Sequence, residues 1–446
     1  MSAMHVAIVG AGPSGFYAAQ ALLAHDQHAR VDLFEKLPAP FGLVRYGVAP
    51  DHPKIRSVIR IFNRIASSDR FVYRGNVTIG RDVSVDELRT HYSAVILACG
   101  LEEPAPLDIP GAALPGCVPA ADFARWYNGH PDFAHRTFTL DSTTAVIIGH
   151  GNVAVDAARI LAQSDHTLRK TDMPDYALNA LRASRIRDIF LIGRRGPVQA
   201  RFASQEIAEL GNLPDARLLI RPEDLILDEA SQAELDAPDN HAARRTMDVL
   251  QALSGFSSAR PKNIHLRFLL SPAALYGNDR VESIRFERNR LTGAPGHLIA
   301  TGTGEFVDLD CGLVFTSIGH RGKPLPGVPF EPARGIVPND KGRVIDNGEA
   351  VPGLYVSGWM KRGPTGLIGN DKADSFETVT CLMEDAPSLP KRNPRGMAEL
   401  LHSRHVEPVS YSDWRRIDEE EIRRGEMHGK PREKFLSFDA IRPFMQ

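Results

Sequence analysis

Residues 6–15 read VAIVGAGPSG, and this stretch decides the fold. An apolar strand runs into Gly10, Gly12 and Gly15, and the following PSGFYAAQALLAH has the periodicity of a helix. In a strand–turn–helix unit with this spacing, the first glycine makes the tight turn and the second admits a pyrophosphate to the backbone. The third glycine lets helix and strand pack closely. The stretch therefore predicts a dinucleotide-binding unit.

One acidic residue indicates which nucleotide the first turn suits. Glu35 ends the next predicted strand, 20 residues after Gly15. A carboxylate at this place accepts hydrogen bonds from ribose hydroxyls, while the helix N-terminus offers free N–H groups to phosphates. The first turn therefore suits the adenosine end of FAD. The alternative is a glycine turn with a purely structural role.

A second turn of the same kind occurs in the middle of the chain. Residues 146–156 read VIIGHGNVAVD, with Gly149, Gly151 and Ala154 in the three key places. The next strand, IFLIGRRG, ends in Arg194 and Arg195 where an acid would otherwise stand. Arginines bind a 2′-phosphate through forked, charge-assisted hydrogen bonds, which a carboxylate would prevent by repulsion. The second nucleotide is therefore predicted to be NADPH; the alternative is a solvated basic turn.

A flavin and a nicotinamide bound by one chain imply hydride transfer. The four cysteines, Cys99, Cys117, Cys311 and Cys381, form neither a CxxC nor a CxxxxC pair, so a redox disulfide is not predicted. No cluster suggests a metal site. From the residues alone, the electron acceptor stays open between oxygen, a small molecule and another protein.

Composition sets the general class of the protein. With 446 residues, 43% hydrophobic and 24% charged, the chain is expected to form two or three globular domains. A net charge of −2 gives no overall attraction to nucleic acid, and no apolar stretch approaches the ~20 residues of a membrane span. The first residues enter a strand at once, so no signal peptide is predicted and the expected location is cytoplasmic.

Alternating strands and helices predict an α/β architecture with parallel sheets, with polar helical segments over residues 165–185 and 228–262.

Four long segments resemble the adrenodoxin reductase family, which includes bacterial NADPH–ferredoxin reductases. They are PFGLVRYGVAPDHPKIRSV (40–58), GHGNVAVDAARIL (149–161), GRRGPVQARF (193–202) and GWMKRGPTGLIGNDKADS (358–375). The resemblance extends to the tail segment HGKPREKF. It implies two Rossmann-like dinucleotide-binding domains of glutathione-reductase type, with the NADP-binding domain inserted into the FAD-binding domain. The expected division is 1–105 and 321–446 for FAD and 106–320 for NADP.

The resemblance also implies an activity and its site residues. Hydride would pass from NADPH to FAD, and single electrons from FAD to an iron–sulfur ferredoxin. Beside the glycines, the implied FAD contacts are Ser14, Glu35, Leu43, Ile79, Trp359, Gly366, Leu367 and Ile368. The implied NADP contacts are His150, Gly151, Asn152, Val153, Arg194, Arg195, Glu206 and Gly366. His52 and Glu209 would position the nicotinamide. Two positions depart from the family pattern, because Arg201 replaces a small apolar residue and His150 an amide.

An acidic ferredoxin would need a local basic surface, and two segments offer one. Arg56, Arg60 and Arg64 are spaced i, i+4, i+8, which in one helix would align them along one side. Arg244 and Arg245 lie in a segment that resembles the basic segment with which relatives hold ferredoxin. The alternative for each segment is a solvated charged face. Two other functions remain: an NADPH-dependent flavin monooxygenase or oxidase that uses oxygen, and a non-catalytic NADPH-binding module.

Overall fold

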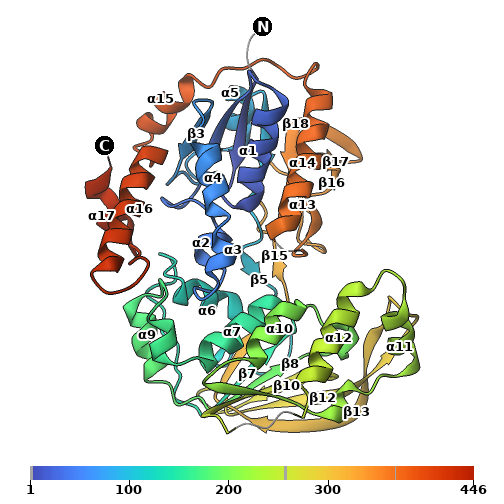
Figure 1. Cartoon of the computed structure of the whole chain (residues 1–446). Coiled ribbons are helices and arrows are strands. Elements are labelled where there is room, and N and C mark those ends of the chain that lie inside the picture. Colours follow the sequence, from blue (N-terminus) through green and yellow to red (C-terminus); the bar gives the residue numbers. More distant parts are fainter. Residues whose placement is uncertain (1–3, 256–258, 367, 446) are drawn as a thin grey trace.

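A computed structural model describes residues 4–255, 259–366 and 368–445. Figure 1 shows two α/β halves, one above the other, with both ends of the chain in the upper half. The fold class predicted from the glycine turns is confirmed, because each half contains a mainly parallel sheet with a dinucleotide turn after its central strand.

The upper half is built on a seven-stranded sheet. In spatial order its strands are β16 (Asn339–Asp340), β17 (Arg343–Asp346), β18 (Glu349–Val356), β4 (Ala94–Leu97), β1 (His5–Val9), β2 (Arg30–Phe34) and β3 (Phe71–Arg74). The strands from β18 to β3 run parallel, whereas β16 and β17 pair antiparallel. Within β1, Val6 and Ile8 face one core while Ala7 and Val9 face another. Both faces are buried, which is why the strand is apolar from Val6 to Val9.

Helices cover both faces of the upper sheet, and α1 packs along α14. The helices of this half are α1 (Pro13–His25), α2 (Leu43–Tyr46), α3 (Pro53–Arg56), α4 (Ile59–Ala66), α5 (Val85–His91), α13 (Trp359–Arg362), α14 (Ile368–Asp385), α15 (Gly396–Ser403), α16 (Tyr411–Glu426), α17 (Phe438–Ile441) and the 3₁₀ turn η3 (Arg442–Phe444). The last three follow the left edge of Figure 1.

The lower half contains a six-stranded parallel sheet. Its strands are β6 (Cys117–Pro119), β14 (Leu313–Thr316), β7 (Thr144–Ile148), β8 (Asp188–Ile192), β10 (Lys262–Arg267) and β9 (Ala216–Ile220). Its helices are α6 (Ala120–Tyr127), α7 (Asn152–Ala162), α8 (Asp165–Leu168), α9 (Asp175–Arg182), α10 (Ser204–Gly211), α11 (Glu229–Asp236) and α12 (His241–Leu253), with short 3₁₀ turns η1 (Pro197–Gln199) and η2 (Pro222–Leu225). Helices α8, α9, α11 and α12 confirm the two predicted polar helical segments.

The two faces of the lower sheet are covered differently. Ala145 and Ile147 of β7 pack against helices, whereas Val146 and Ile148 pack against a second, antiparallel sheet. This three-stranded sheet, which the sequence did not predict, consists of β11 (Leu270–Tyr276), β12 (Ser283–Thr292) and β13 (Ile299–Asp310). Its presence explains why β7 is apolar at every buried position, as in a strand with two covered faces.

Two short antiparallel strands join the halves. The chain leaves the upper half through β5 (Glu103–Pro104) and returns through β15 (His320–Arg321). The predicted domain boundaries, at residues 105 and 320, lie beside this ladder. Among the described residues, none of the helices combines the length and the apolar character needed to cross a membrane.

Candidate functional site

The first glycine turn has the geometry that a dinucleotide requires. Gly10 has φ of 107°, and a Cβ there would lie 2.4 Å from the carbonyl oxygen of Ala98, so only glycine fits. A Cβ at Gly15 would lie 2.0 Å from the carbonyl oxygen of Gly10. At Gly12, by contrast, a Cβ would meet nothing within 4 Å. The open side of Gly12, at the uncapped N-terminus of α1, is therefore free for a phosphate.

Glu35 is buried directly beside this turn. One oxygen of its carboxylate accepts the N–H of Ala11 at 2.8 Å and the other accepts the N–H of Leu37 at 3.1 Å. Burial raises the pKa of Glu35, and these two hydrogen bonds act in the opposite direction. A carboxylate has about four acceptor sites, so the two bonds orient it and leave capacity for ribose hydroxyls.

Segments distant in the sequence close over the first turn. Gly42, just before Leu43 and α2, approaches so closely that a Cβ on it would lie 3.0 Å from Gly12 Cα. From the other end of the chain, Gly358 has φ of 76°, and a Cβ on it would lie 2.2 Å from Ser14 Oγ. Trp359 begins α13 directly after this contact. The two segments that carry predicted FAD contacts therefore meet at the first turn.

The other predicted FAD contacts are Ile79, Gly366, Leu367 and Ile368. Ile79 is buried two residues beyond Val77, whose N–H donates to the Glu35 carbonyl at 2.9 Å. Gly366 is exposed with φ of 86°, and Ile368 is the first residue of α14. Leu367 lies outside the described residues.

The second turn repeats the geometry of the first in the lower half. Gly149 has φ of 128°, and a Cβ there would lie 2.1 Å from the Ser317 carbonyl oxygen. A Cβ on Gly151 would meet nothing within 4 Å, and Gly151 precedes the uncapped N-terminus of α7. Asn152 and Val153 begin α7, and Asn152 Oδ1 accepts the N–H of Ala203 at 2.9 Å.

The ring of His150 packs beneath this turn. It lies between Phe202 and Phe268, with ring centroids 5.5 and 4.9 Å away. Burial lowers the pKa of His150 to about 4, so the imidazole is neutral at physiological pH. The position that departs from the family pattern therefore holds a neutral packing group.

Three arginines gather at the end of β8. Arg195 is half-buried, and Arg194 and Arg201 are exposed. Burial lowers the pKa of Arg195, and the charges of Arg201 and Arg194 lower it further. The backbone N–H of Arg201 donates to the His150 carbonyl at 2.9 Å, so this arginine segment lies against the second turn. A dianion bound here would relieve the repulsion among the three cations.

His52 lies between the two halves. It precedes α3 in the upper half, and its closest acids belong to α7 and α10 of the lower half. His52 Nε2 is 3.2 Å from Glu206 Oε2 and 3.4 Å from Asp156 Oδ1. Its predicted partner Glu209 is farther away, 3.7 Å from Nδ1, and has a partly exposed side chain. The structure thus brings His52, Glu206 and Glu209 together and adds Asp156.

A buried arginine organises the acids around His52. Arg159 of α7 donates to Asp156 at 2.6 Å, to Glu206 at 3.1 Å and to Asp51 at 2.7 Å. Burial lowers the pKa of His52, but its contacts with Asp156 and Glu206 outweigh burial and raise it to about 10. His52 is therefore a cation at physiological pH. Sequence reasoning missed Arg159 and Asp156, although VAVDAAR puts both on the helix that follows the second turn.

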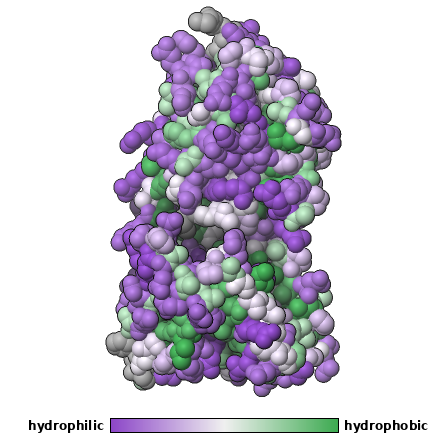
Figure 2. Space-filling view, turned by 90° about the vertical axis from the view of Figure 1, so that its right-hand side faces the viewer, coloured by the Kyte–Doolittle hydropathy of each residue, from purple (hydrophilic) through white to green (hydrophobic). Residues whose placement is uncertain are grey.

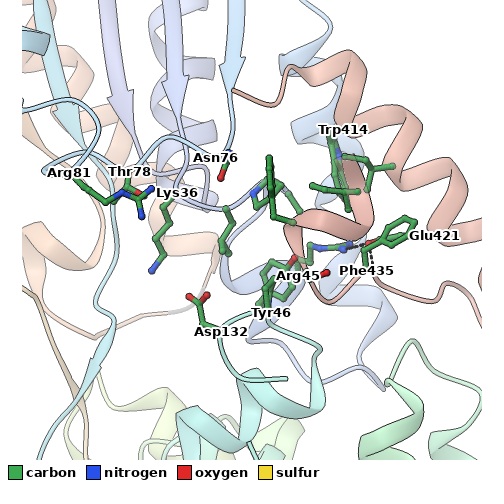
Figure 3. Close-up of a pocket in the computed structure, with 18 residues that line it drawn as sticks. Lys36, Arg45, Tyr46, Asn76, Thr78, Arg81, Asp132, Trp414, Glu421 and Phe435 are labelled. Carbon is green, nitrogen blue, oxygen red and sulfur yellow. Dashed lines mark hydrogen bonds and ion pairs between the residues drawn. The ribbon is translucent and has the colours of Figure 1, made fainter. Parts of the chain in front are cut away.

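A cavity of about 430 Å³ lies just beyond Glu35, where the upper half meets the C-terminal segment (Figure 3). Lys36 and Thr78 lie on one side, and Arg45, Trp414 and Glu421 on the other. Lys36 pairs with Glu102 at 2.6 Å. Arg45 is buried and donates to both oxygens of Glu421, at 2.6 and 2.8 Å. The segment GLVRYG is therefore anchored to α16.

Comparison with known proteins agrees with this geometry. A family model described as pyridine nucleotide-disulphide oxidoreductase matches residues 4–209. The mitochondrial NADPH:adrenodoxin oxidoreductase of Mus musculus is 44% identical over 445 residues, which cover 97% of this chain and 89% of that protein. The NADPH-ferredoxin reductase FprA of Mycobacterium tuberculosis is 40% identical over 464 residues, covering 99% of each. The solved structure of that FprA in complex with NADPH matches with a TM-score of 0.93, at 39% identity and 99% coverage of both chains.

The chain belongs to the NADPH:adrenodoxin oxidoreductase family. Membership confirms the resemblance found in the sequence and makes the chain an oxidoreductase that uses FAD and NADPH. The residues fit both groups, because each half offers an open middle glycine at an uncapped helix N-terminus. The upper turn adds the oriented carboxylate of Glu35, and the lower turn adds the arginines.

The matching family model is named for a disulphide, but the structure of this chain shows no disulfide bond among its four cysteines. Cys99, Cys117, Cys311 and Cys381 are all free.

The prediction that Arg56, Arg60 and Arg64 lie along one side of one helix is wrong. The chain breaks between α3 and α4, so Arg56, Arg60 and Arg64 do not share one helix. Arg56 turns inward and donates to both carboxylate oxygens of Asp172 at 2.6 Å, because a buried acid there needs a partner. Arg60 and Arg64 remain exposed.

The two arginines of the second predicted docking segment also differ in their surroundings. Arg244 bonds its own loop, donating to the carbonyls of Leu235, Ala237 and Pro238 at 2.7–3.0 Å. Arg245 is exposed on α12.

Proposed function

We propose that this chain takes a hydride from NADPH onto FAD and passes single electrons to a ferredoxin-like iron–sulfur protein. The observation that carries the proposal is the cluster around His52, where the FAD half and the NADP half meet through ion pairs. Seen from the side of α12 and α14, the surface between the two halves is hollowed (Figure 2). A nicotinamide held by the lower half would reach the flavin there.

The first turn and its neighbours hold FAD in this proposal. The N-terminus of α1 receives the pyrophosphate and Glu35 receives the ribose hydroxyls. Ser14, Leu43, Ile79 and Trp359 would line the remaining path, and Gly366 and Ile368 would contact the isoalloxazine. FAD supplies the two-electron to one-electron conversion, because it is stable with two electrons, one or none.

The second turn and the arginine segment hold NADPH. Residues 150–153 bind the pyrophosphate at the N-terminus of α7, and Arg194 and Arg195 bind the 2′-phosphate. Glu206 serves at this site through its ion pairs with His52 and Arg159.

His52 and Glu209 position the nicotinamide and do not take the hydride. Hydride transfer needs no protein base at the donor carbon, so the demand on the protein is orientation and electrostatics. As a cation held by Asp156 and Glu206, His52 offers a fixed N–H donor at the junction of the halves. The partly exposed Glu209 carboxylate accepts from Gln205 Nε2 at 3.0 Å and keeps acceptor capacity for the carboxamide of the nicotinamide.

The acceptor is proposed from the relatives, whose names give adrenodoxin and ferredoxin as their partners. Ferredoxins are typically acidic, and the exposed cations Arg245, Arg60 and Arg64 are candidate contacts. Arg244 is proposed to support this surface indirectly, because it fixes the loop before α12.

The decisive test is NADPH-driven cytochrome c reduction with and without added ferredoxin. The proposal expects strong stimulation by ferredoxin and slow formation of peroxide in its absence. Fast peroxide formation without ferredoxin would instead establish an oxygen-using flavoenzyme. Bound FAD that no acceptor can oxidise after NADPH is added would indicate a non-catalytic module.

A further inference from the structure

The C-terminal segment reaches the lower half after α16 and carries a buried lysine there. After α16, residues 428–435 pass beside α9 (Figure 1). Lys434 is fully buried; its Nζ donates to the Asn128 carbonyl at 2.9 Å and lies 2.9 Å from Asp172 Oδ2. Lys430 donates to the Met173 carbonyl at 3.1 Å. The tail is thus anchored in the half that binds NADP.

Asp172 joins this tail to a third segment. Besides Lys434, it accepts two bonds from Arg56 Nη1, both at 2.6 Å. Burial raises the pKa of Asp172, but the charges of Lys434 and Arg56 outweigh burial and hold it well below its usual range. One ionised carboxylate of the lower half therefore binds the guanidinium of Arg56 and the amino group of Lys434, whose pKa burial lowers to about 7 against the opposing charge of Asp172.

Arg56 connects Asp172 to the segment that carries His52. His52 directly precedes α3, and Arg56 ends this helix. The backbone N–H of Arg56 donates to the His52 carbonyl at 3.4 Å, and its guanidinium donates to the Val48 carbonyl at 2.7 Å. The same guanidinium donates to Asn128 Oδ1 at 2.5 Å. Arg56 therefore ties residues 48–56, which carry His52, to the lower half.

The tail itself is held rigidly on α16. Glu421 of α16 accepts from Arg45, from Arg432 at 3.1 Å and from the N–H of Phe435 at 3.0 Å. Figure 3 shows Glu421 and Phe435 beside Arg45. A Cβ on Gly425 would lie 2.3 Å from Arg432 Cα, so the returning chain packs directly on the helix. Lys434 thus reaches Asp172 from a fixed support.

We propose that Lys434 and Asp172 are positioning residues for His52, acting through Arg56. This inference rests on the proposed role of His52 at the nicotinamide. Lys434 lies 382 positions from His52 in the sequence and touches neither predicted cofactor site. Without Lys434, Asp172 loses one of its two cations while still buried, and Arg56 and the His52 segment shift to compensate. A misplacement of about 1 Å slows a reaction by up to about 100-fold.

The first experiment compares Lys434→Met with Lys430→Met, which removes the other tail lysine but no partner of Arg56. Single-turnover reduction of the bound flavin by NADPH should slow by roughly 3- to 100-fold in Lys434→Met. Lys430→Met should react as the unaltered protein does. Both variants should keep their affinity for NADP⁺, because the arginine segment is untouched. Equal rates in the two folded variants would overturn the inference.

A double variant separates positioning from a general loss of structure. In a His52→Gln background, Lys434→Met should slow flavin reduction no further, since its effect passes through His52. An additional fall as large as that in the unaltered background would overturn the inference. If His52→Gln slows flavin reduction and Lys434→Met does not, the role of His52 stands and only the positioning role of Lys434 and Asp172 is rejected. If His52→Gln has no effect, the proposed role of His52 falls first, and the positioning with it.

A readout without turnover uses the imidazole NMR signals of His52 in the absence of NADPH. The unaltered protein should titrate with a pKa of about 10. Lys434→Met should move this signal and its titration, and Lys430→Met should not. Should Lys434→Met fail to fold, Asp172→Asn, which keeps the size and removes the charge, takes its place. A His52 signal unchanged in a folded Lys434 or Asp172 variant would refute the inference.

Discussion

Replacing Arg195 by alanine should convert a strong preference for NADPH into a weak one. Arg195 is half-buried, and burial together with the charges of Arg201 and Arg194 lowers its pKa. Its guanidinium is therefore poorly solvated and repelled by its neighbours until a dianion arrives. A hydrogen bond to a charged group contributes about 1.5–3 kcal/mol. Its loss should weaken binding of NADP⁺ and of 2′,5′-ADP roughly 10- to 100-fold.

The assay pairs binding with turnover. Titration calorimetry gives the Kd for 2′,5′-ADP, and kcat/KM is measured for NADPH and NADH with a small neutral acceptor. We expect kcat/KM for NADPH to fall with the affinity while that for NADH stays constant. Arg194→Ala should cause a smaller loss, because Arg194 is exposed and its charge is screened by solvent.

Arg187→Ala is the matched control. This exposed arginine precedes β8, at the opposite end of the strand from Arg194. It should leave both coenzymes unaffected. Equal losses for NADPH and NADH in Arg195→Ala, or an unchanged Kd for 2′,5′-ADP, would refute a 2′-phosphate site at the arginine segment.

Three other predictions concern His52, the first turn and docking. Flavin reduction by NADPH should be constant through neutral pH and fall as the pH rises through about 10, where His52 loses its proton. The stability gained from its ion pairs should likewise be complete below a pH of about 6.5 and be lost through that upper range. A His52→Gln pH profile with the same upper fall would contradict this assignment. Gly12→Ala should fold, since its Cβ meets no atom within 4 Å, but should bind FAD more weakly; full FAD occupancy after purification would count against the pyrophosphate site. Arg245→Glu should raise KM for ferredoxin at low salt and leave reduction of a small neutral acceptor unchanged, whereas ferredoxin kinetics unaltered by this reversal would remove α12 from the docking surface.

The two dinucleotide units could be predicted because their determinants are local. Gly10, Gly15 and Gly149 stand where a side chain would strike a carbonyl oxygen of the same unit or the neighbouring strand. Such constraints leave a fixed spacing in the sequence. Glu35 follows the strand after α1, and Arg194 follows the strand after α7, α8 and α9. These patterns also predicted the parallel sheets and the choice of coenzymes.

The prediction of one row of arginines along a helix was wrong because helical spacing in the sequence does not show where a helix ends. The arrangement of Arg56, Arg60 and Arg64 assumed one continuous helix, but the chain turns between α3 and α4. Arg56 then meets Asp172, 116 residues away. An arginine on a polar segment looks the same in the sequence whether it faces solvent or a buried carboxylate.

By itself, the sequence determined two nucleotide turns, their order along the chain and the charge that each presents to its ligand. Only the tertiary structure decided the partners of His52, the antiparallel sheet over β7 and the link from Lys434 through Asp172 to Arg56. The physical reason is separation along the chain. The spacing of the glycines lies within one strand–turn–helix unit, whereas a buried ion pair forms between whichever segments the packing of the two halves brings together.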